Sequence, residues 1–217
     1  TVLIIVYILN AVNLIDGIDG LASGLGMIAF LAFGCLFVYL HRWMYALLAF
    51  ASLGVLVPFF YYNVFGQTRR GRKLFMGDTG SLTIGMLLAV MAIRLSMFDS
   101  VKERLLPGSI VVAFSFLMVP MLDVVRVVLH RMRKRKPLFS PDKNHIHHKF
   151  MALGMPQHRA MLCIVGIAVG FTVLNVCAIH YLSVTVLFLL DVAAWTVMHF
   201  CITGKILKNN RKNHIKD

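Results

Sequence analysis

Four polar side chains recur at intervals of three near the start of the chain, at Asn10, Asn13, Asp16 and Asp19. On an α-helix a step of three residues turns the side chain back by only about 60°, so these groups would lie along one side of a helix end. Carboxylates can hold Mg²⁺, and a site of this kind would suit a phosphate-bearing ligand. The alternative is a pair of Asp-Gly turns that end one helix and begin the next. Turns need neither a second Asp nor two preceding amides, so the pattern favours a site.

Another acidic residue, Asp78, lies between glycines in the stretch Phe75–Ser81 (FMGDTGS), after four cations at positions 69–73. Two interpretations remain open. Asp78 or Thr79 could simply cap the N-terminus of the helix that follows. Alternatively, the glycines allow a phosphate or a metal ion to approach the backbone, and the helix N-terminus attracts anions.

Three histidines, His145, His147 and His148, lie between Lys143 and Lys149. A solvated basic loop is the ordinary explanation for such a charge run. A zinc site is disfavoured, because no cysteine accompanies the histidines and their spacing is not that of common zinc sites. We expect the imidazoles to supply hydrogen-bond donors and positive charge to a diphosphate.

The elements that position these groups are membrane spans. The 217 residues are 59% hydrophobic and only 14% charged, which excludes both an ordinary soluble domain and a disordered chain. Since a spanning helix needs about 20 apolar residues, the sequence predicts an all-α, polytopic transmembrane helix bundle, with residues 1–217 forming one integral-membrane domain. One partial span is expected at Thr1–Leu14, and six full spans are expected at Leu21–Leu40, Trp43–Tyr62, Ser81–Phe98, Gly108–Leu129, Ala160–His180 and Leu182–Thr203.

The cations orient this bundle. Of the 22 Lys and Arg residues, all but four fall on one side of the predicted bundle, and the exceptions are Arg42, Arg94, Lys102 and Arg104. By the positive-inside rule the basic side is cytoplasmic, so the C-terminus and all three motifs are predicted to be cytoplasmic. The basic loop 130–159 is expected to contain a short helix at Pro141–Leu153, with Ser140 as N-cap and Gly154 just past its C-terminus.

Carboxylates, histidines and cations on one membrane face suit phosphoryl transfer from a soluble nucleotide to a lipid phosphate, where catalysis is mostly positioning and charge neutralisation. A transporter is the competing hypothesis, because Arg94, Asp123 and Asp191 lie within spans. Arg94 is close enough to a helix end to snorkel, Asp123 can pair with Arg126 three residues on, and Asp191 has no evident partner. Nucleic-acid binding is disfavoured, since the cations follow membrane topology.

Three ordered motifs, Asn10–Leu21 (NAVNLIDGIDGL), Phe75–Leu82 (FMGDTGSL) and Ser140–Lys149 (SPDKNHIHHK), resemble those of the polyprenyl-phosphate N-acetylhexosamine-1-phosphate transferases (glycosyltransferase family 4), in the branch of bacterial WecA- and TagO-type enzymes. Pro120–Asp123 (PMLD) is also similar to that family. The resemblance implies that a polyprenyl (undecaprenyl) phosphate attacks the β-phosphorus of a UDP-N-acetylhexosamine and releases UMP. It implies a multi-pass enzyme of the bacterial inner membrane, of the phosphotransferase type. Such an enzyme would catalyse the first membrane step in the synthesis of O-antigen, capsule or teichoic acid linkage. The resemblance leaves open whether the protein is a homodimer.

Site residues follow from the same resemblance, with Mg²⁺ as the cofactor and Mn²⁺ as a substitute. Asp78 would be the main metal ligand, assisted by Asn13, and Asp16, Asp19 and Asp78 would form the catalytic group. The predicted substrate-binding residues are Asn13, Gly17 and Ile18 beside the uracil, Phe75 stacking on it, and His145, His147 and His148 at the diphosphate or sugar. Direct attack is favoured over a phospho-aspartyl intermediate.

The sequence departs from the family pattern in one respect, and in another it narrows the choice of sugar substrate. The family's adjacent Asp-Asp pair is absent from these 217 residues, which predicts that N-terminal spans are missing and keeps a catalytically inactive, truncated homologue as an alternative. The pattern His145-Ile146-His147-His148 differs from the three consecutive histidines of the relatives that transfer phospho-MurNAc-pentapeptide. It therefore favours a simpler amino sugar, GlcNAc above all.

Overall fold

The structure, a computed structural model, describes residues 1–97, 108–135, 137 and 145–213 of the chain. Within these residues it contains helices and no strand. The elements are α1 (Val2–Ile15), α2 (Leu21–Tyr39), α3 (Trp43–Phe65), the short η1 (Thr68–Arg70), α4 (Gly77–Ser96), α5 (Ser109–Ser115), α6 (Met118–Arg133), α7 (Ile146–Ala152), α8 (Gln157–Ala178) and α9 (Val184–Asn213).

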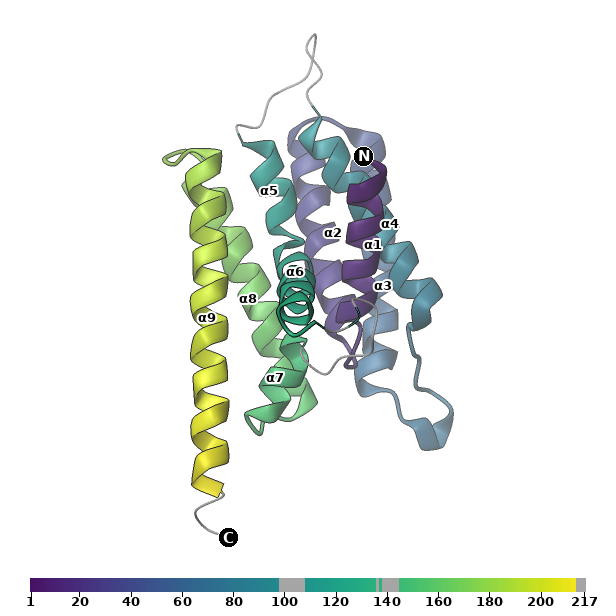
Figure 1. The fold of residues 1–217 in the computed structure, drawn as a ribbon. Coiled ribbons are helices and arrows are strands. Elements are labelled where there is room, and N and C mark those ends of the chain that lie inside the picture. The colour runs from purple at the N-terminus through teal and green to yellow at the C-terminus, as the bar shows by residue number, and fades with distance from the viewer. Residues whose placement is uncertain (98–107, 136, 138–144, 214–217) are drawn as a thin grey trace.

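The long helices stand side by side as an upright bundle (Figure 1). Five of them, α2, α3, α4, α8 and α9, are long and apolar enough to cross a membrane, and α5 with α6 makes a sixth candidate span. The 14-residue α1 is apolar but shorter than a full span. The described residues therefore confirm an all-α, multi-pass membrane protein, with five to six of the predicted full spans long and apolar enough to cross a membrane.

The predicted straight span Gly108–Leu129 is wrong in one respect, because it is two helices. The axes of α5 and α6 differ by 78°, so α6 is seen nearly end-on in Figure 1 while α5 stands upright. The break falls at Phe116 and Leu117, just before Pro120 in the first turn of α6. Proline has no backbone N–H to donate to the carbonyl four residues earlier, so it suits the start of a new helix and not the middle of a continuous one.

The short helix of the basic loop begins later than predicted. α7 starts at Ile146, and His145 precedes it with an extended backbone, so His145 is not in the first turns of the helix. The expected cap at Ser140 and Pro141 lies outside the described residues. The predicted end is confirmed, because Leu153 is the C-cap and Gly154 follows with φ of +86°, a conformation that glycine adopts without strain.

The last helix extends beyond the predicted span. α9 continues past Thr203 to Asn213, because the basic segment that follows Gly204 has no proline and is made of residues that tolerate helical geometry, such as Lys205 and Leu207.

Two hydrophobic clusters hold the helices together. The first surrounds the fully buried Phe30, Phe33 and Phe37 of α2. The second joins Ile18, in the turn after α1, to Ile146 of α7 and other buried residues of α8. Between membrane helices such side chains stabilise the bundle through close van der Waals packing, and the second cluster packs the first and third motifs against α8.

Helices α1 and α4 approach most closely at Gly85. A Cβ placed there would lie 2.9 Å from the Cα of Leu9 and 3.4 Å from its carbonyl oxygen, so the two backbones leave no room for a side chain. We expect Gly85→Val to push α1 from α4 and to lower the melting temperature in detergent, since overpacking costs about 1–3 kcal/mol.

The matched control for this substitution is Gly166→Val on α8, where a Cβ would meet nothing within 4 Å. Thermal unfolding of both purified variants of the full-length protein checks the prediction. Equal melting temperatures would show that the α1–α4 contact is not as tight as the structure has it.

Candidate active site

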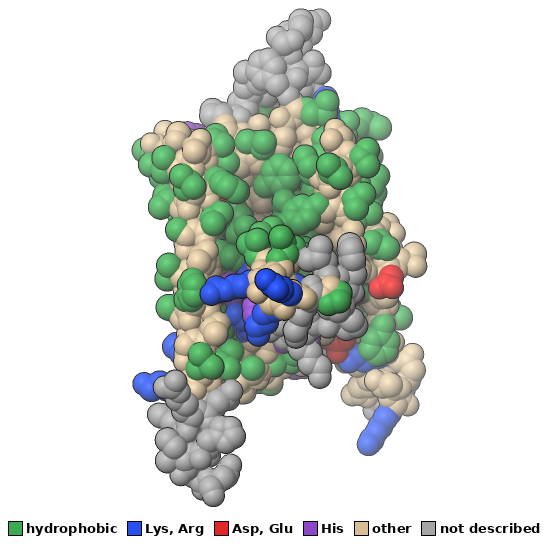
Figure 2. All heavy atoms as spheres, viewed as in Figure 1, with side chains coloured by type: hydrophobic (Ala, Val, Ile, Leu, Met, Phe, Trp, Pro, Cys, Tyr) green, Lys and Arg blue, Asp and Glu red, His purple; other side chains and the backbone are tan. Residues whose placement is uncertain are grey.

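All three polar motifs lie at one end of the bundle. The turn between α1 and α2, the beginning of α4 and the helix α7 gather at the lower end of Figure 1, where the loop between α3 and α4 also lies. Most of the Lys and Arg side chains visible in Figure 2 lie in the lower half of the same view. The motifs are far apart in sequence, and the bundle brings them to a common face.

A pair of hydrogen bonds joins the first motif to the second. The side-chain amide of Asn13 on α1 donates to Oδ1 of Asp78 at 3.0 Å and to Oγ of Ser81 at 2.8 Å. Because both donated bonds use Nδ2, the carbonyl oxygen of Asn13 is left as an acceptor or a ligand. Asp78 itself is exposed, which leaves its carboxylate accessible to a ligand.

Asp16 shares this negatively charged corner. Burial raises the pKa of its carboxyl to about 6, and the negative charges of Asp19 and Asp78 add to the rise. Three carboxylates that disfavour one another's charge are relieved by a bound cation or by a proton. The three acids that the sequence singled out are therefore close enough to act as one group.

Lys73 partly neutralises this group, and the sequence analysis did not single it out. Its Nζ lies 2.5 Å from Oδ2 of Asp19, with both side chains largely buried. The same ammonium lies 5.5 Å from the centre of the Phe75 ring, a cation–π distance. A lysine only two residues before an aromatic side chain, and directly before the second motif, was a usable signal for this role.

Asn63 is a further residue that the sequence analysis missed. Its side chain is buried at the end of α3, accepts a hydrogen bond of 2.6 Å from the Gly20 backbone N–H and donates one of 2.8 Å to the Leu74 carbonyl. Gly20 has φ of +81°, so the turn needs glycine there. Asn63 thereby fixes the positions of the first motif and of the loop before the second. The signal was a polar amide at the end of an apolar run, where burial demands partners.

The third motif contacts the first through His147. A Cβ at Gly17 would lie 2.2 Å from Nε2 of His147, so the imidazole packs directly on the glycine backbone. Burial lowers the pKa of His147 to about 4, helped by the positive charges of His148 and His145. His147 is therefore neutral at physiological pH and offers a hydrogen-bonding ring, while the sequence analysis expected positive charge from all three histidines.

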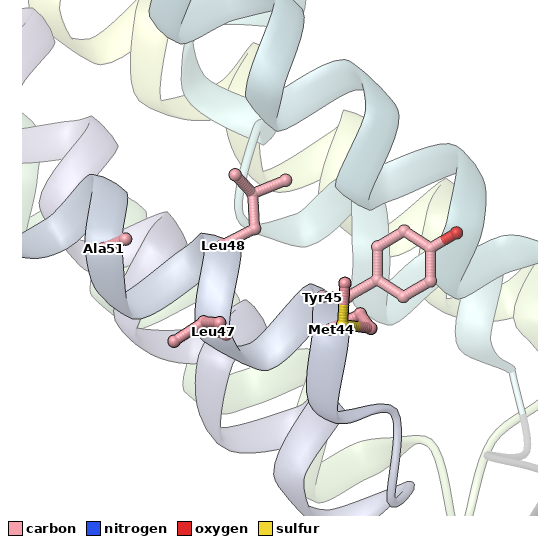
Figure 3. A pocket seen from close by; sticks show the side chains of 5 residues that line it. All are labelled: Met44, Tyr45, Leu47, Leu48 and Ala51. Carbon is pink, nitrogen blue, oxygen red and sulfur yellow. The ribbon is translucent and has the colours of Figure 1, made fainter.

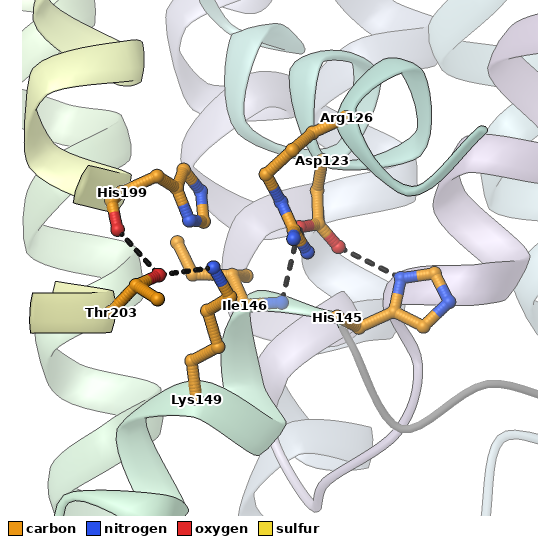
Figure 4. A network of polar contacts seen from close by, with 7 residues as sticks. All are labelled: Asp123, Arg126, His145, Ile146, Lys149, His199 and Thr203. Atoms are coloured by element: carbon orange, nitrogen blue, oxygen red, sulfur yellow. Dashed lines mark hydrogen bonds and ion pairs between the residues drawn. The ribbon is translucent and has the colours of Figure 1, made fainter. Parts of the chain in front are cut away.

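Asp123 ties the histidine segment to α6, as Figure 4 shows. Its fully buried carboxylate accepts hydrogen bonds from Nη2 of Arg126 at 3.0 Å, from Nδ1 of His145 at 2.8 Å and from the Ile146 backbone N–H at 3.0 Å. The Asp123–Arg126 pair confirms the spacing argument. The bonds to His145 and Ile146 were not predictable, because a 22-residue separation leaves no local pattern.

Lys149 anchors the other part of α7. Its Nζ donates to Oγ1 of Thr203 on α9 at 2.9 Å, and that hydroxyl donates to the His199 carbonyl. Burial, together with the charge of Arg126, lowers the pKa of Lys149 to about 8. α7 is thus held between α6 and α9.

The residues predicted to contact the base differ in exposure. The side chain of Ile18 is buried in the second hydrophobic cluster, so only its backbone can face a ligand. Phe75 is 69% exposed, and its contact with Lys73 leaves most of the ring accessible. Gly17, beside Ile18, is exposed on the same turn.

The described residues contain no group of three His, Cys, Asp or Glu side chains placed to hold a metal ion by themselves. That arrangement is not required by Mg²⁺, which keeps several waters and binds through one or two carboxylates plus substrate phosphates. The exposed carboxylate of Asp78, with the Asn13 carbonyl beside it and the charge of Asp16 nearby, fits such a sparse site.

Two cavities lie away from these polar groups. One, of about 710 Å³, is a shallow apolar depression on α3 lined by Met44, Tyr45, Leu47, Leu48 and Ala51 (Figure 3), with no group suited to catalysis. The other, of about 630 Å³, is an apolar groove in the hollow green region above the end of α6 in Figure 2. We name it the lateral groove; it is lined by Ile4, Tyr7, Ile110, Val111, Phe114, Met118, Met121, Leu122, Val125, Val184, Thr185 and Phe188.

The charges within spans that suggested a transporter have structural partners. Asp191 accepts a hydrogen bond of 2.9 Å from the side-chain amide of Asn175 on α8. Arg94 lies with its guanidinium carbon 5.4 Å from the centre of the Tyr45 ring. With Asp123 bound to Arg126 and His145, none of these three residues lines an evident ion path among the described residues.

Comparison with known proteins shows which proteins the chain is similar to. The sequence model of glycosyl transferase family 4 matches residues 1–96. The chain is 31% identical over 196 residues to the undecaprenyl-phosphate α-N-acetylglucosaminyl 1-phosphate transferase of Escherichia coli K12. This alignment covers 89% of this chain and 52% of the relative. It is 34% identical over 193 residues to the probable undecaprenyl-phosphate N-acetylglucosaminyl 1-phosphate transferase of Bacillus subtilis, covering 88% of this chain and 51% of the relative.

The chain spans about half the length of the curated relatives that it matches. The matched family region contains the first two motifs, and the longer alignments extend over most of the remaining chain. Residues 1–96 therefore match the sequence model of glycosyl transferase family 4, and the chain is similar over most of its length to two proteins named as undecaprenyl-phosphate GlcNAc 1-phosphate transferases.

Proposed function

We propose that the protein containing this chain transfers GlcNAc 1-phosphate from UDP-GlcNAc to undecaprenyl phosphate and releases UMP. The observation that carries this proposal is the meeting of three distant motifs at one end of a membrane bundle. Asn13 binds Asp78 across α1 and α4, and His147 packs on Gly17. The names of the relatives support undecaprenyl phosphate as the acceptor and GlcNAc 1-phosphate as the transferred group, and the UDP donor follows from the resemblance of the three motifs.

The reaction joins two phosphates of like charge. An oxygen of the lipid phosphate attacks the β-phosphorus of UDP-GlcNAc, the bond between that phosphorus and the bridging oxygen breaks, and UMP leaves with the electron pair. The product is a lipid diphosphate that carries the sugar. The residues described here act by positioning both substrates and by balancing charge, which is the main source of catalysis in phosphoryl transfer.

Each part of the site has a role in this scheme. Asp16 and Asp19 line the nucleotide-sugar side, where Lys73 balances one negative charge. Phe75 offers an exposed ring for stacking on the uracil, next to the backbone of Gly17 and Ile18. His145, His147 and His148 face the diphosphate or the sugar as hydrogen-bonding rings. Neutral His147 can donate or accept there without a charge change near neutral pH.

Mg²⁺ is the proposed cofactor, with Mn²⁺ as a substitute. Asp78 would hold it, assisted by the carbonyl oxygen of Asn13, and it would neutralise negative charge on the donor diphosphate. Asp16 adds negative charge to the same corner, which favours a cation there.

The lateral groove is suited to the lipid acceptor. Its walls are apolar side chains from α1, α5, α6 and α9, and Leu122 and Val125 lie on its α6 side. Arg126 follows one turn after Leu122, and residues four apart share a helix face. A polyprenyl chain in the groove would therefore bring its phosphate towards the polar end of the bundle.

The proposed location is a bacterial inner membrane with the site in the cytoplasm. A cytoplasmic site gives access to UDP-GlcNAc, and the product would begin the assembly of a cell-surface glycan. The concentration of Lys and Arg residues at the same end of the bundle supports this orientation.

The direct test is UMP release by the purified full-length protein, given UDP-GlcNAc, undecaprenyl phosphate and Mg²⁺. We expect release that stops when EDTA removes the metal. Asp78→Asn should reduce the rate about a hundredfold or more, because a charge that acts on the reacting phosphates is lost.

A binding measurement that does not depend on turnover complements this assay. Thermal unfolding with and without Mg²⁺ should show stabilisation of the natural protein and none of Asp78→Asn, which reports on the metal independently of turnover. No UMP from a folded full-length protein would reject the transferase proposal and favour the inactive homologue. A near-normal rate for Asp78→Asn would remove Asp78 from the metal.

Phe75→Ala should weaken the binding of UDP-GlcNAc. Base–aromatic stacking contributes about 1–3 kcal/mol per base, so the KM for UDP-GlcNAc should rise roughly 5- to 150-fold while kcat changes less. Phe75→Tyr keeps an aromatic face and serves as the control, with a KM close to that of the natural protein. An unchanged KM in Phe75→Ala would exclude base stacking by this ring.

The orientation is tested by a reporter fused after Asp217 of the full-length protein. We expect a cytoplasmic reporter to be active and a periplasmic alkaline phosphatase to be inactive. The reverse pattern would place the three motifs on the side of the membrane without UDP-GlcNAc and would overturn the proposal.

A further inference from the structure

Asp123 accepts hydrogen bonds from three different residues, yet neither the motifs nor the proposed chemistry assigns it a role. Oδ1 accepts from both Arg126 and the Ile146 backbone, and Oδ2 accepts from His145. The carboxylate is fully buried, and a buried carboxylate persists only when its partners compensate the loss of water. Here three donors do so.

These contacts determine which nitrogen of His145 carries hydrogen. An ionised carboxylate only accepts hydrogen bonds, and the adjacent Arg126 guanidinium favours ionised Asp123. Nδ1 of His145 must therefore be the donor in the 2.8 Å bond to Oδ2. In the neutral ring this leaves Nε2 as an acceptor, on the ring edge that faces away from Asp123 in Figure 4.

The same carboxylate also fixes the start of α7. The Ile146 N–H is at the first turn, where helical backbone donors have no intrahelical partner, and Asp123 supplies the acceptor from another helix. His145 and His147 stack with ring centres 5.9 Å apart and planes only 3° from parallel. The orientation of His145 is thus coupled to the ring that packs on Gly17.

We infer that Asp123 is a positioning residue, which holds His145 in the Nδ1–H tautomer and docks the start of α7 so that the histidines face the Asp16–Gly17 turn. Only the expected effect of Asp123 on the reaction rate rests on the proposed function. The tautomer and the docking are properties of the fold.

Asp123→Asn is the informative substitution, because it preserves shape and leaves Oδ1 to accept from Arg126 and Ile146. Its amide nitrogen would replace Oδ2 as a donor facing Nδ1 of His145, which favours transfer of the ring proton to Nε2. The tautomer is measured by ¹⁵N NMR of histidine-labelled full-length protein near neutral pH, with His145 assigned from the signal that His145→Gln loses.

The expected result is an Nδ1–H signal for His145 in the natural protein and an Nε2–H signal in Asp123→Asn. Thr203→Val is the matched control, because it removes the anchor of Lys149 on α9 and leaves Asp123 in place; it should retain the Nδ1–H tautomer. An Nε2–H tautomer in the natural protein would overturn the inference even if Asp123→Asn failed to fold, as would an unchanged tautomer in a folded Asp123→Asn.

Kinetics separate a positioning role from a merely structural one. We expect Asp123→Asn to lower kcat for UMP release about 10- to 100-fold, the loss typical when the partner of a functional histidine is removed. If Asp123 acts through His145, the double variant with His145→Gln should be no slower than His145→Gln alone. Additive losses would contradict the inference. Absence of UMP release from the natural protein would instead reject the proposed function, and the NMR result would still stand.

Discussion

The buried carboxylate of Asp123 is the contact on which the arrangement of the histidine segment depends. In a chain that is 59% hydrophobic, a polar group inside the bundle has few partners and no bulk water. Burial therefore favours pairing with another polar group, and the pairs that form join distant parts of the chain. Asp123 with His145 and Asn63 with Gly20 follow the same rule. The site is assembled from the bonds that keep its own polar groups satisfied.

The bend between α5 and α6 gives Asp123 access to these partners. In a straight span the charges of α6 would extend along the bundle axis. With the axis turned by 78°, Asp123 faces α7, while Val125 and Leu122 border the lateral groove. One helix therefore contributes both to the polar end and to the apolar groove, which links the place proposed for lipid to the place proposed for chemistry.

Hydrophobic run lengths were enough to predict the spans, and spacing was enough to predict the motifs, because both are local signals. The sequence placed the motifs of Asn13 and Asp78 on the same membrane face, and in the structure these two side chains are in contact. The bend was missed, since apolar composition does not report the direction of a helix, and a proline within an apolar run does not give the angle between the helices on either side. The start of α7 was also missed, because its cap comes from Asp123, which is 23 residues away. Asn63 and Lys73 are single polar residues outside any motif, and their roles depend on tertiary partners that no local pattern specifies.

The long separation between Asp123 and its partners has a consequence for biogenesis. During synthesis the segment that becomes α5 and α6 leaves the ribosome before His145 and Ile146 do, so only Arg126 can then pair with the carboxylate. An apolar segment of this length can enter the bilayer as an ordinary span. The tilt of α6 gains its stabilising bonds only after α7 has been made and docked. The polar end of the bundle therefore reaches its final structure late, and it is completed by α8 and α9, which hold α7 in place.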